Sequence, residues 1–164
     1  MNDIIHGAGF LGLGGNFLAD VGLVLSLGVI LLFTVGMVLA WREQYETHKW
    51  VQTAGVVLNP VLVAWLMIGP YIGEVAREFG NPPYPAGFYW LPTVHGLTGA
   101  AALVFGVYVT LRGHNVQLPK ALMFNNYKPY MRVAYGLYLT ATMLCIAVYV
   151  MWFMISPVAP NFEN

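Results

Sequence analysis

Long apolar runs separated by short polar segments dominate the chain. Four stretches of about 20 residues or more lack Asp, Glu, Lys and Arg, and a helix needs about 20 such residues to cross the roughly 30 Å hydrocarbon layer. Uninterrupted apolar runs are typical of helices rather than barrel strands. The pattern predicts an all-α, integral membrane four-helix up-down bundle that forms a single domain over residues 1–164, with spans at about residues 18–41, 49–73, 91–111 and 130–156.

Composition supports a membrane protein. Hydrophobic residues make up 59% of the chain and charged residues 9%, whereas about a quarter of a soluble domain is charged. Seven Lys and Arg balance seven Asp and Glu, so no charge excess favours nucleic acid. The single cysteine, Cys145, excludes an intrachain disulfide framework and CxxC motifs, and we interpret it as a packing residue.

The distribution of basic residues predicts the orientation. One side of the predicted bundle carries only Arg77, and the loops of the other side carry Arg42, Lys49, Arg112, Lys120, Lys128 and Arg132. By the positive-inside rule both termini lie outside, in a multi-pass protein of a prokaryotic inner (plasma) membrane. The leader HGAGFLGLGG lacks the features of a cleavable signal peptide, so we expect it to lie at the interface or to fold against the bundle mouth. Each of the two longer loops is a candidate for a partial helix on the membrane surface.

Polar residues inside the predicted spans recur at helical spacing. His48, Gln52, Gly55 and Asn59 share one face of the second span. We expect such residues to face the bundle interior. A second stripe, on the fourth span, consists of Tyr135, Tyr138, Thr142, Cys145 and Tyr149.

The histidines are the candidate ligands, because imidazole binds haem iron, copper and zinc. His48 opens the second span, and His95 is expected about one turn inside the opposite end of the third, so most of the bilayer separates them. One haem iron or metal ion therefore cannot bind both. The predicted topology permits His48 with His114 inside and His6 with His95 outside. For each histidine the plainer interpretation is a cap or an anchor at the membrane surface.

Groups near these histidines have expected roles too. Gln52 or Glu46 is a candidate acceptor for the second N–H of His48, and Lys49 is a candidate partner for headgroups or a haem propionate. Glu74 and Glu78 are expected at a hydrated helix end, with proton or cation entry as a second interpretation. Hydrolase, metalloprotease and nucleotide-binding motifs are missing from the sequence.

The chain resembles the four-span bacterial membrane proteins of the domain-of-unknown-function 420 family along nearly its whole length. The resemblance rests on GFLG and FLADVGLVL, HKWVQTAGVVLN, PTVHGLTGA, LRGHN and YKPYMRVAYGLYLTATMLCIAVYVM. Some members look like the CtaM-type factors needed to mature haem-copper cytochrome oxidase. The resemblance implies a role beside respiratory haem or copper enzymes, and it carries over His48, His95 and His114, with Arg132 as a fourth position.

Together these observations predict a non-catalytic accessory or assembly protein of a respiratory or other electron-transfer complex. Its expected partners are membrane lipid and subunits of that complex. His48, His95 and His114 are the candidate ligands of haem, with copper as the weaker candidate. Two alternatives remain open: a cytochrome b-like electron carrier with bis-histidine haem, and a structural component that binds only lipid and neighbouring subunits.

Overall fold

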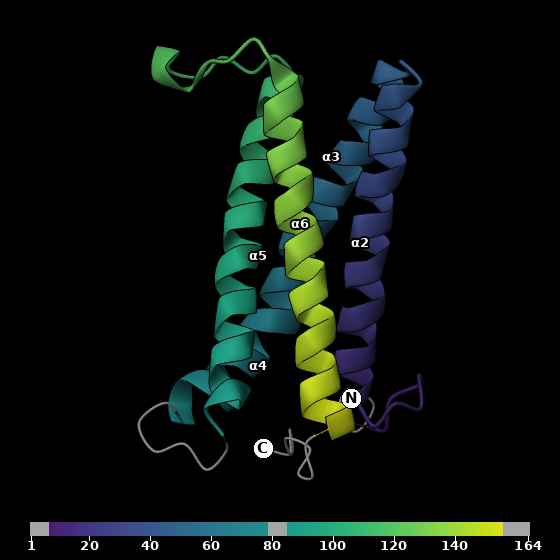
Figure 1. Cartoon of the computed structure of the whole chain (residues 1–164), viewed down its shortest axis with the longest axis vertical. Coiled ribbons are helices and arrows are strands. Elements are labelled where there is room, and N and C mark those ends of the chain that lie inside the picture. The colour runs from purple at the N-terminus through teal and green to yellow at the C-terminus, as the bar shows by residue number, and fades with distance from the viewer. Residues whose placement is uncertain (1–6, 79–84, 156–164) are drawn as a thin grey trace.

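Four long helical segments stand side by side in the computed structural model, which describes residues 7–78 and 85–155 (Figure 1). Each is long and apolar enough to cross a membrane, with a mean hydropathy between 1.6 and 2.7. The predicted all-α, four-helix architecture is confirmed. The segments are α2 (Phe17–Trp41), α3 with its extension (Tyr45–Gly73), α5 (Ala86–Gly113), and α6 with its extension (Tyr127–Ile155).

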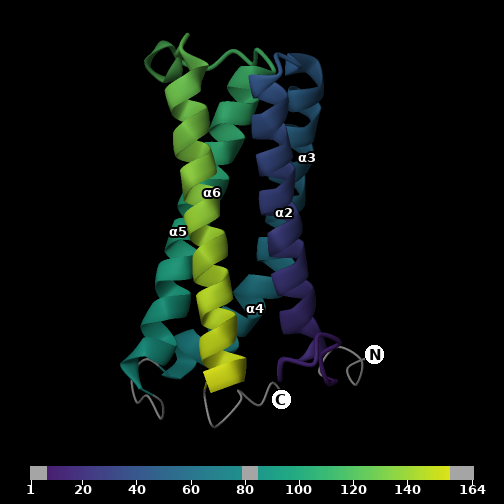
Figure 2. The ribbon, with the colours of Figure 1, turned by 45° about the vertical axis from the view of Figure 1, so that its right-hand side comes forward.

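Consecutive helices run in opposite directions, and the start of α2 and the last described turn of α6's extension lie at the same end of the bundle (Figures 1 and 2). We call this the termini end. The opposite end, which holds the α2–α3 and α5–α6 connections, is the loop end. Going round the bundle, α2 packs against α3 and α6, and α5 packs against α6 and α3. The arrangement is thus up-down, while the side of the membrane that each end faces stays a prediction.

The second half of span two departs from α-helical geometry. After α3 (Tyr45–Leu62) the chain forms a π-helical stretch η1 (Val63–Met67), a single turn α4 (Ile68–Pro70) and another π-helical stretch η2 (Tyr71–Val75). Pro60 and Pro70 cannot donate to the carbonyls one turn earlier, which favours such irregular turns. Because π-helical turns concentrate at functional sites, this stretch is the first place to search for one.

Helix α5 begins at Ala86, earlier than the predicted start at residue 91, so Pro92 lies inside the helix. Proline leaves the carbonyl of Phe88 without its usual intrahelical donor. The indole Nε1–H of Trp152 on η5 (Val150–Ile155) donates to that carbonyl over 3.3 Å. The neighbouring helix therefore makes the internal proline tolerable and ties η5 to α5.

Polar side chains join α2 to α6 along most of their length. The Tyr135 hydroxyl lies 3.1 Å from that of Thr34, and the Cys145 thiol lies 3.6 Å from the Ser26 hydroxyl. Tyr138 and Thr142 are buried between these contacts. The expected interior stripe on the fourth span is confirmed, since the interacting partners of its outermost members, Tyr135 and Tyr149, are both on α2.

In their described parts, residues 76–78 and 114–126, the two longer connections each contain a single 3-10 turn. These turns are η3 (Ala76–Glu78) and η4 (Lys120–Leu122). At the loop end the guanidinium of Arg112 is buried and donates to the carbonyls of Val116 and Phe124, each over 3.2 Å. Arg112, which the charge pattern counts among the basic residues of this side, thus holds the α5–α6 connection.

Candidate cofactor site at the termini end

The glycine-rich leader folds over the mouth of the bundle and binds a buried carboxylate. Asp20, near the start of α2, has none of its surface exposed. One of its oxygens accepts the backbone N–H of Leu11 over 2.6 Å, and the other accepts the hydroxyl of Tyr149. A Cβ on Gly9 or Gly15 would overlap the Asp20 carboxylate, which explains why glycine stands there. Of the two expectations for the leader, folding against the mouth is the one confirmed over residues 7–16.

A cavity of about 560 Å³ lies between the four helices in this half of the bundle. Small-molecule and cofactor sites commonly have volumes of about 300 to 1,000 Å³. Its walls come from α2, the irregular stretch of span two, α5 and α6 with η5. The wall is mostly apolar, and its members include Leu23, Leu66, Met67, Ile68, Ile72, Pro92, Leu97, Val148, Trp152 and Phe153. The π-helical stretches η1 and η2 therefore line one side of this cavity.

His95 contributes its imidazole to this cavity in a fixed orientation. Its Nδ1 lies 3.0 Å from the carbonyl oxygen of Ala141 on α6. A carbonyl only accepts, so Nδ1 carries the proton, and in the neutral ring Nε2 keeps its lone pair. An imidazole whose other N–H is held by a backbone carbonyl is the usual arrangement of a metal-bound histidine. His95 is thus prepared to bind an electrophile through Nε2.

The hydroxyl, thiol and indole groups that line the cavity donate their hydrogen bonds to other protein atoms. Thr93 donates to the Tyr89 carbonyl over 2.7 Å, so the Tyr71 hydroxyl, 3.0 Å away, donates to Thr93. The remaining donations each leave the cavity: Tyr149 to Asp20, Cys145 to Ser26 and Trp152 to the Phe88 carbonyl. Only the side-chain amide of Asn16, at the rim, adds a further donor among the described lining residues. The interior wall therefore offers acceptors, with His95 Nε2 as the strongest base.

A second, smaller cavity of about 30 Å³ lies deeper in the bundle and shares His95, Met67 and Cys145 with the first. It is lined partly by polar side chains, among them Asn59 and Thr142. One water needs about 10 to 15 Å³ measured in this way, so there is room for about two. His95 thus lines both the large apolar cavity and the small one that holds the amide of Asn59.

His48 has a different environment at the loop end. Its Nδ1 lies 2.7 Å from the carbonyl oxygen of Gly36 on α2, and Gln52 donates to the Phe33 carbonyl on the same helix over 3.4 Å. The sequence-based choice of Gln52 or Glu46 as the partner of His48 is therefore wrong. Glu46 instead pairs with Lys49 over 3.1 Å at the surface. His48 and Gln52 tie α3 to α2.

His114, which follows the last residue of α5, contacts a different face of α3. Its Nε2 is 2.8 Å from the hydroxyl of Thr53, which itself donates to the Lys49 carbonyl, so the imidazole is the donor. Thr53 and His48 are five residues apart, which separates them by about 140° around a helix. The contacts thus direct His48 towards α2 and His114 towards Thr53, and they do not bring the predicted pair together.

His48 and His95 also lie at different depths, though closer than expected. His95 is the tenth residue of α5, well beyond the predicted single turn, because the helix begins at Ala86. It shares the small cavity with Asn59, which stands eleven residues after His48, a rise of about 16 Å. This distance still prevents the two imidazoles from binding one iron or metal ion.

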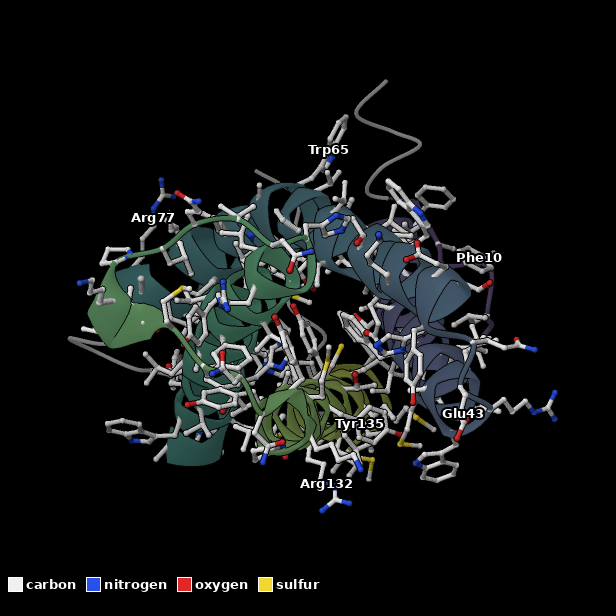
Figure 3. All side chains as sticks on the ribbon, turned by 90° about the horizontal axis from the view of Figure 1, so that it is seen from above. Phe10, Glu43, Trp65, Arg77, Arg132 and Tyr135 are labelled. Carbon is white, nitrogen blue, oxygen red and sulfur yellow. The ribbon has the colours of Figure 1, made fainter. Side chains whose placement is uncertain are left out.

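The remaining predicted positions give no further ligand. Arg132 points away from the bundle, as do Trp65 and Arg77 (Figure 3). His6, and with it the predicted His6–His95 pair, lies outside the described residues, as do the side chains of Glu74 and Glu78. Within residues 7–78 and 85–155, the described His, Cys, Asp and Glu side chains form no group of three that could hold a metal ion.

No family model, curated protein or solved structure matches the chain. The resemblance to the domain-of-unknown-function 420 family therefore stays a prediction from the sequence.

Proposed function

We propose that the chain is an accessory or assembly protein of a respiratory or other membrane electron-transfer complex, and that it holds haem through His95. One observation carries the proposal: His95 lines an apolar cavity of cofactor size while a backbone carbonyl accepts its Nδ1–H, which leaves Nε2 as the lone-pair nitrogen of the neutral ring. We place the protein in a prokaryotic inner membrane with both termini outside, following its charge distribution.

The residues of the cavity fit haem in several respects. His95 would bind the iron, and the thioether of Met67, which lines the same cavity, would be the second candidate ligand. The apolar walls suit the macrocycle. Lys and Arg side chains are missing from the described lining, so propionates would depend on water or headgroups, and the expected role of Lys49 at the loop end does not apply to this site. Haem would supply redox or haem-transfer chemistry, while the chain positions and shields it.

This arrangement favours an accessory protein over the cytochrome b-like alternative. A bis-histidine haem needs two imidazoles facing one iron, and His95 is the only imidazole among the described residues that line the cavity. A single imidazole beside a thioether does not meet that requirement. Copper is less suited, because the site combines one nitrogen ligand with a large apolar wall.

The test is haem titration of the purified protein, followed by its visible spectrum and iron content. We expect about one haem per chain for the unaltered protein, His48→Ala and His114→Ala. For His95→Ala we expect loss of the Soret shift and its recovery with free imidazole. Met67→Leu should retain haem but change its spin state. Equal haem titrations of the unaltered protein and the three His→Ala variants, or no haem binding by any of them, would contradict the proposal and favour a purely structural component.

The accessory role needs a separate test in the source cell. Removing the gene should lower the haem content of the partner oxidase in isolated membranes, and Glu46→Ala should restore it. His95→Ala, at matched protein level, should not. Full restoration by His95→Ala would separate the protein's biological role from this cavity.

A further inference from the structure

The large cavity has two features that haem binding alone does not explain. It reaches the surface between the irregular stretch of span two and α5, where Ile68, Ile72 and Leu97 line it while 49%, 52% and 68% exposed. In a bundle whose helices cross a membrane, such apolar side chains face lipid. A ligand can therefore enter this cavity sideways from the bilayer.

The second feature is the hydrogen-bonding character of the wall. The protons of His95, Tyr71, Thr93, Tyr149, Cys145 and Trp152 are all directed to protein acceptors. Beside His95, away from the Asn16 amide at the rim, a polar head that only accepts hydrogen bonds, such as a ketone or a quinone, would leave itself and His95 Nε2 unpaired in an apolar space. A ligand that carries an O–H on its head pairs with Nε2.

We propose that this cavity binds an isoprenoid hydroquinone from the membrane and prefers it to the corresponding quinone. The phenolic O–H donates to His95 Nε2, and the flat ring lies among the apolar and aromatic walls that include Trp152. The isoprenoid tail leaves through the opening beside Ile68 and Leu97. This site uses the same nitrogen as the proposed haem site, so the two ligands exclude one another.

The chemistry selects this class among membrane components. An acyl chain has no donor for Nε2, and a phospholipid headgroup is anionic and would need cations, whereas no Lys or Arg belongs to the described lining. A hydroquinone combines an aromatic hydroxyl with an apolar tail. Its oxidised form has the same shape without the donor, which gives an internal control.

The experiment is calorimetric titration of haem-free protein in nanodiscs, under anaerobic conditions, with a short-chain hydroquinone, its quinone and its dimethyl ether. We expect the hydroquinone to bind about tenfold or more tightly than either analogue, because only it pairs with Nε2. His95→Leu should abolish the difference. His95→Gln, whose amide adds N–H donors, should shift the preference towards the quinone. His48→Gln is the matched control at the loop end and should leave the preference intact.

Equal affinities for the three compounds, a preference for the quinone, or a preference that survives His95→Leu would overturn the inference. Binding of ordinary lipid that none of them displaces would do the same. The result is separable from that of haem titration. Haem binding without hydroquinone preference removes this inference alone, and hydroquinone preference without haem binding removes only the haem proposal.

Discussion

The two halves of the bundle use the same polar residue types for opposite purposes. At the loop end His48 and Gln52 reach carbonyls of α2 beside a closely packed core that includes Phe33 and Tyr138, whose ring centroids are 4.1 Å apart. At the termini end, His95 also donates to a carbonyl, but its side chain lines a cavity of about 560 Å³. A histidine in a membrane helix that donates one N–H to a carbonyl can thus serve two purposes. Where its surroundings are closely packed it links two helices, and where it lines a cavity it can also bind a ligand.

The largest expected effect is that of Asp20→Ala at the termini end. The substitution leaves the buried Tyr149 hydroxyl and the Leu11 N–H without their charged acceptor. We expect the free energy of unfolding to fall by about 3 kcal/mol, since each hydrogen bond to a buried charge contributes about 1.5 to 3 kcal/mol. Unfolding in mixed detergent micelles measures it.

The control for Asp20 is Glu46→Ala, which removes an exposed acid whose surface ion pair contributes about 0 to 1 kcal/mol. Because Tyr149 lines the cavity, Asp20→Ala should also weaken haem binding, and Glu46→Ala should not. Similar unfolding free energies for the two variants would show that the leader and Asp20 do not fasten the termini end.

Gly55→Leu tests the packing of the loop half. A Cβ on Gly55 would lie 3.0 Å from the ring of Phe33, so a larger side chain must displace a buried aromatic. Overpacking of this kind costs about 1 to 3 kcal/mol, and we expect about 2 kcal/mol by the same unfolding assay. Gly28→Leu, at a position with open space around it, should be close to neutral.

Haem titration of Gly55→Leu tests whether packing in the loop half affects the cavity in the termini half. Gly55 lies outside the cavity lining, so Gly55→Leu should lower stability while leaving haem affinity unchanged at temperatures where the protein is folded. If Gly55→Leu weakened haem binding as strongly as Asp20→Ala, the two halves would be coupled, contrary to our account.

The smallest expected effect is that of His48→Leu. It removes one hydrogen bond between α3 and α2, and such contacts between membrane helices contribute about 0.6 kcal/mol on average. We expect a loss of that order and an unchanged haem spectrum. A loss of haem in this variant would make His48 a ligand and would remove the distinction between the two histidines.

The sequence was sufficient for the features that depend on one helix at a time. Charge-free runs located the four helices, and helical spacing located the interior stripe that includes Thr142 and Cys145. It missed Asp20 because a lone acid at the start of a span reads as a hydrated end, and its partner Tyr149 is far away along the chain. Glycines in the preceding leader were the available signal.

Three other features could not be predicted because each depends on contacts between different helices. The partner of His48 is a backbone carbonyl, which every residue of α2 has, so no side-chain pattern could identify Gly36. The depth of His95 depended on whether a helix continues through Pro92, and the Trp152 indole that makes this possible comes from another helix. The cavity could not be predicted, because it arises from the relative placement of four helices. Pro60 and Pro70 marked only the irregular stretch that lines it.

The central claim is the protonation pattern of His95, and nitrogen-15 NMR of histidine-labelled, haem-free protein tests it most directly. The His95 signals are assigned by their absence from His95→Gln. Our account predicts a neutral ring at neutral pH, protonated at Nδ1 and unprotonated at Nε2, with Nε2 shifting when haem or a hydroquinone is added. A ring protonated at Nε2, or an Nε2 signal that neither ligand alters, would contradict the account.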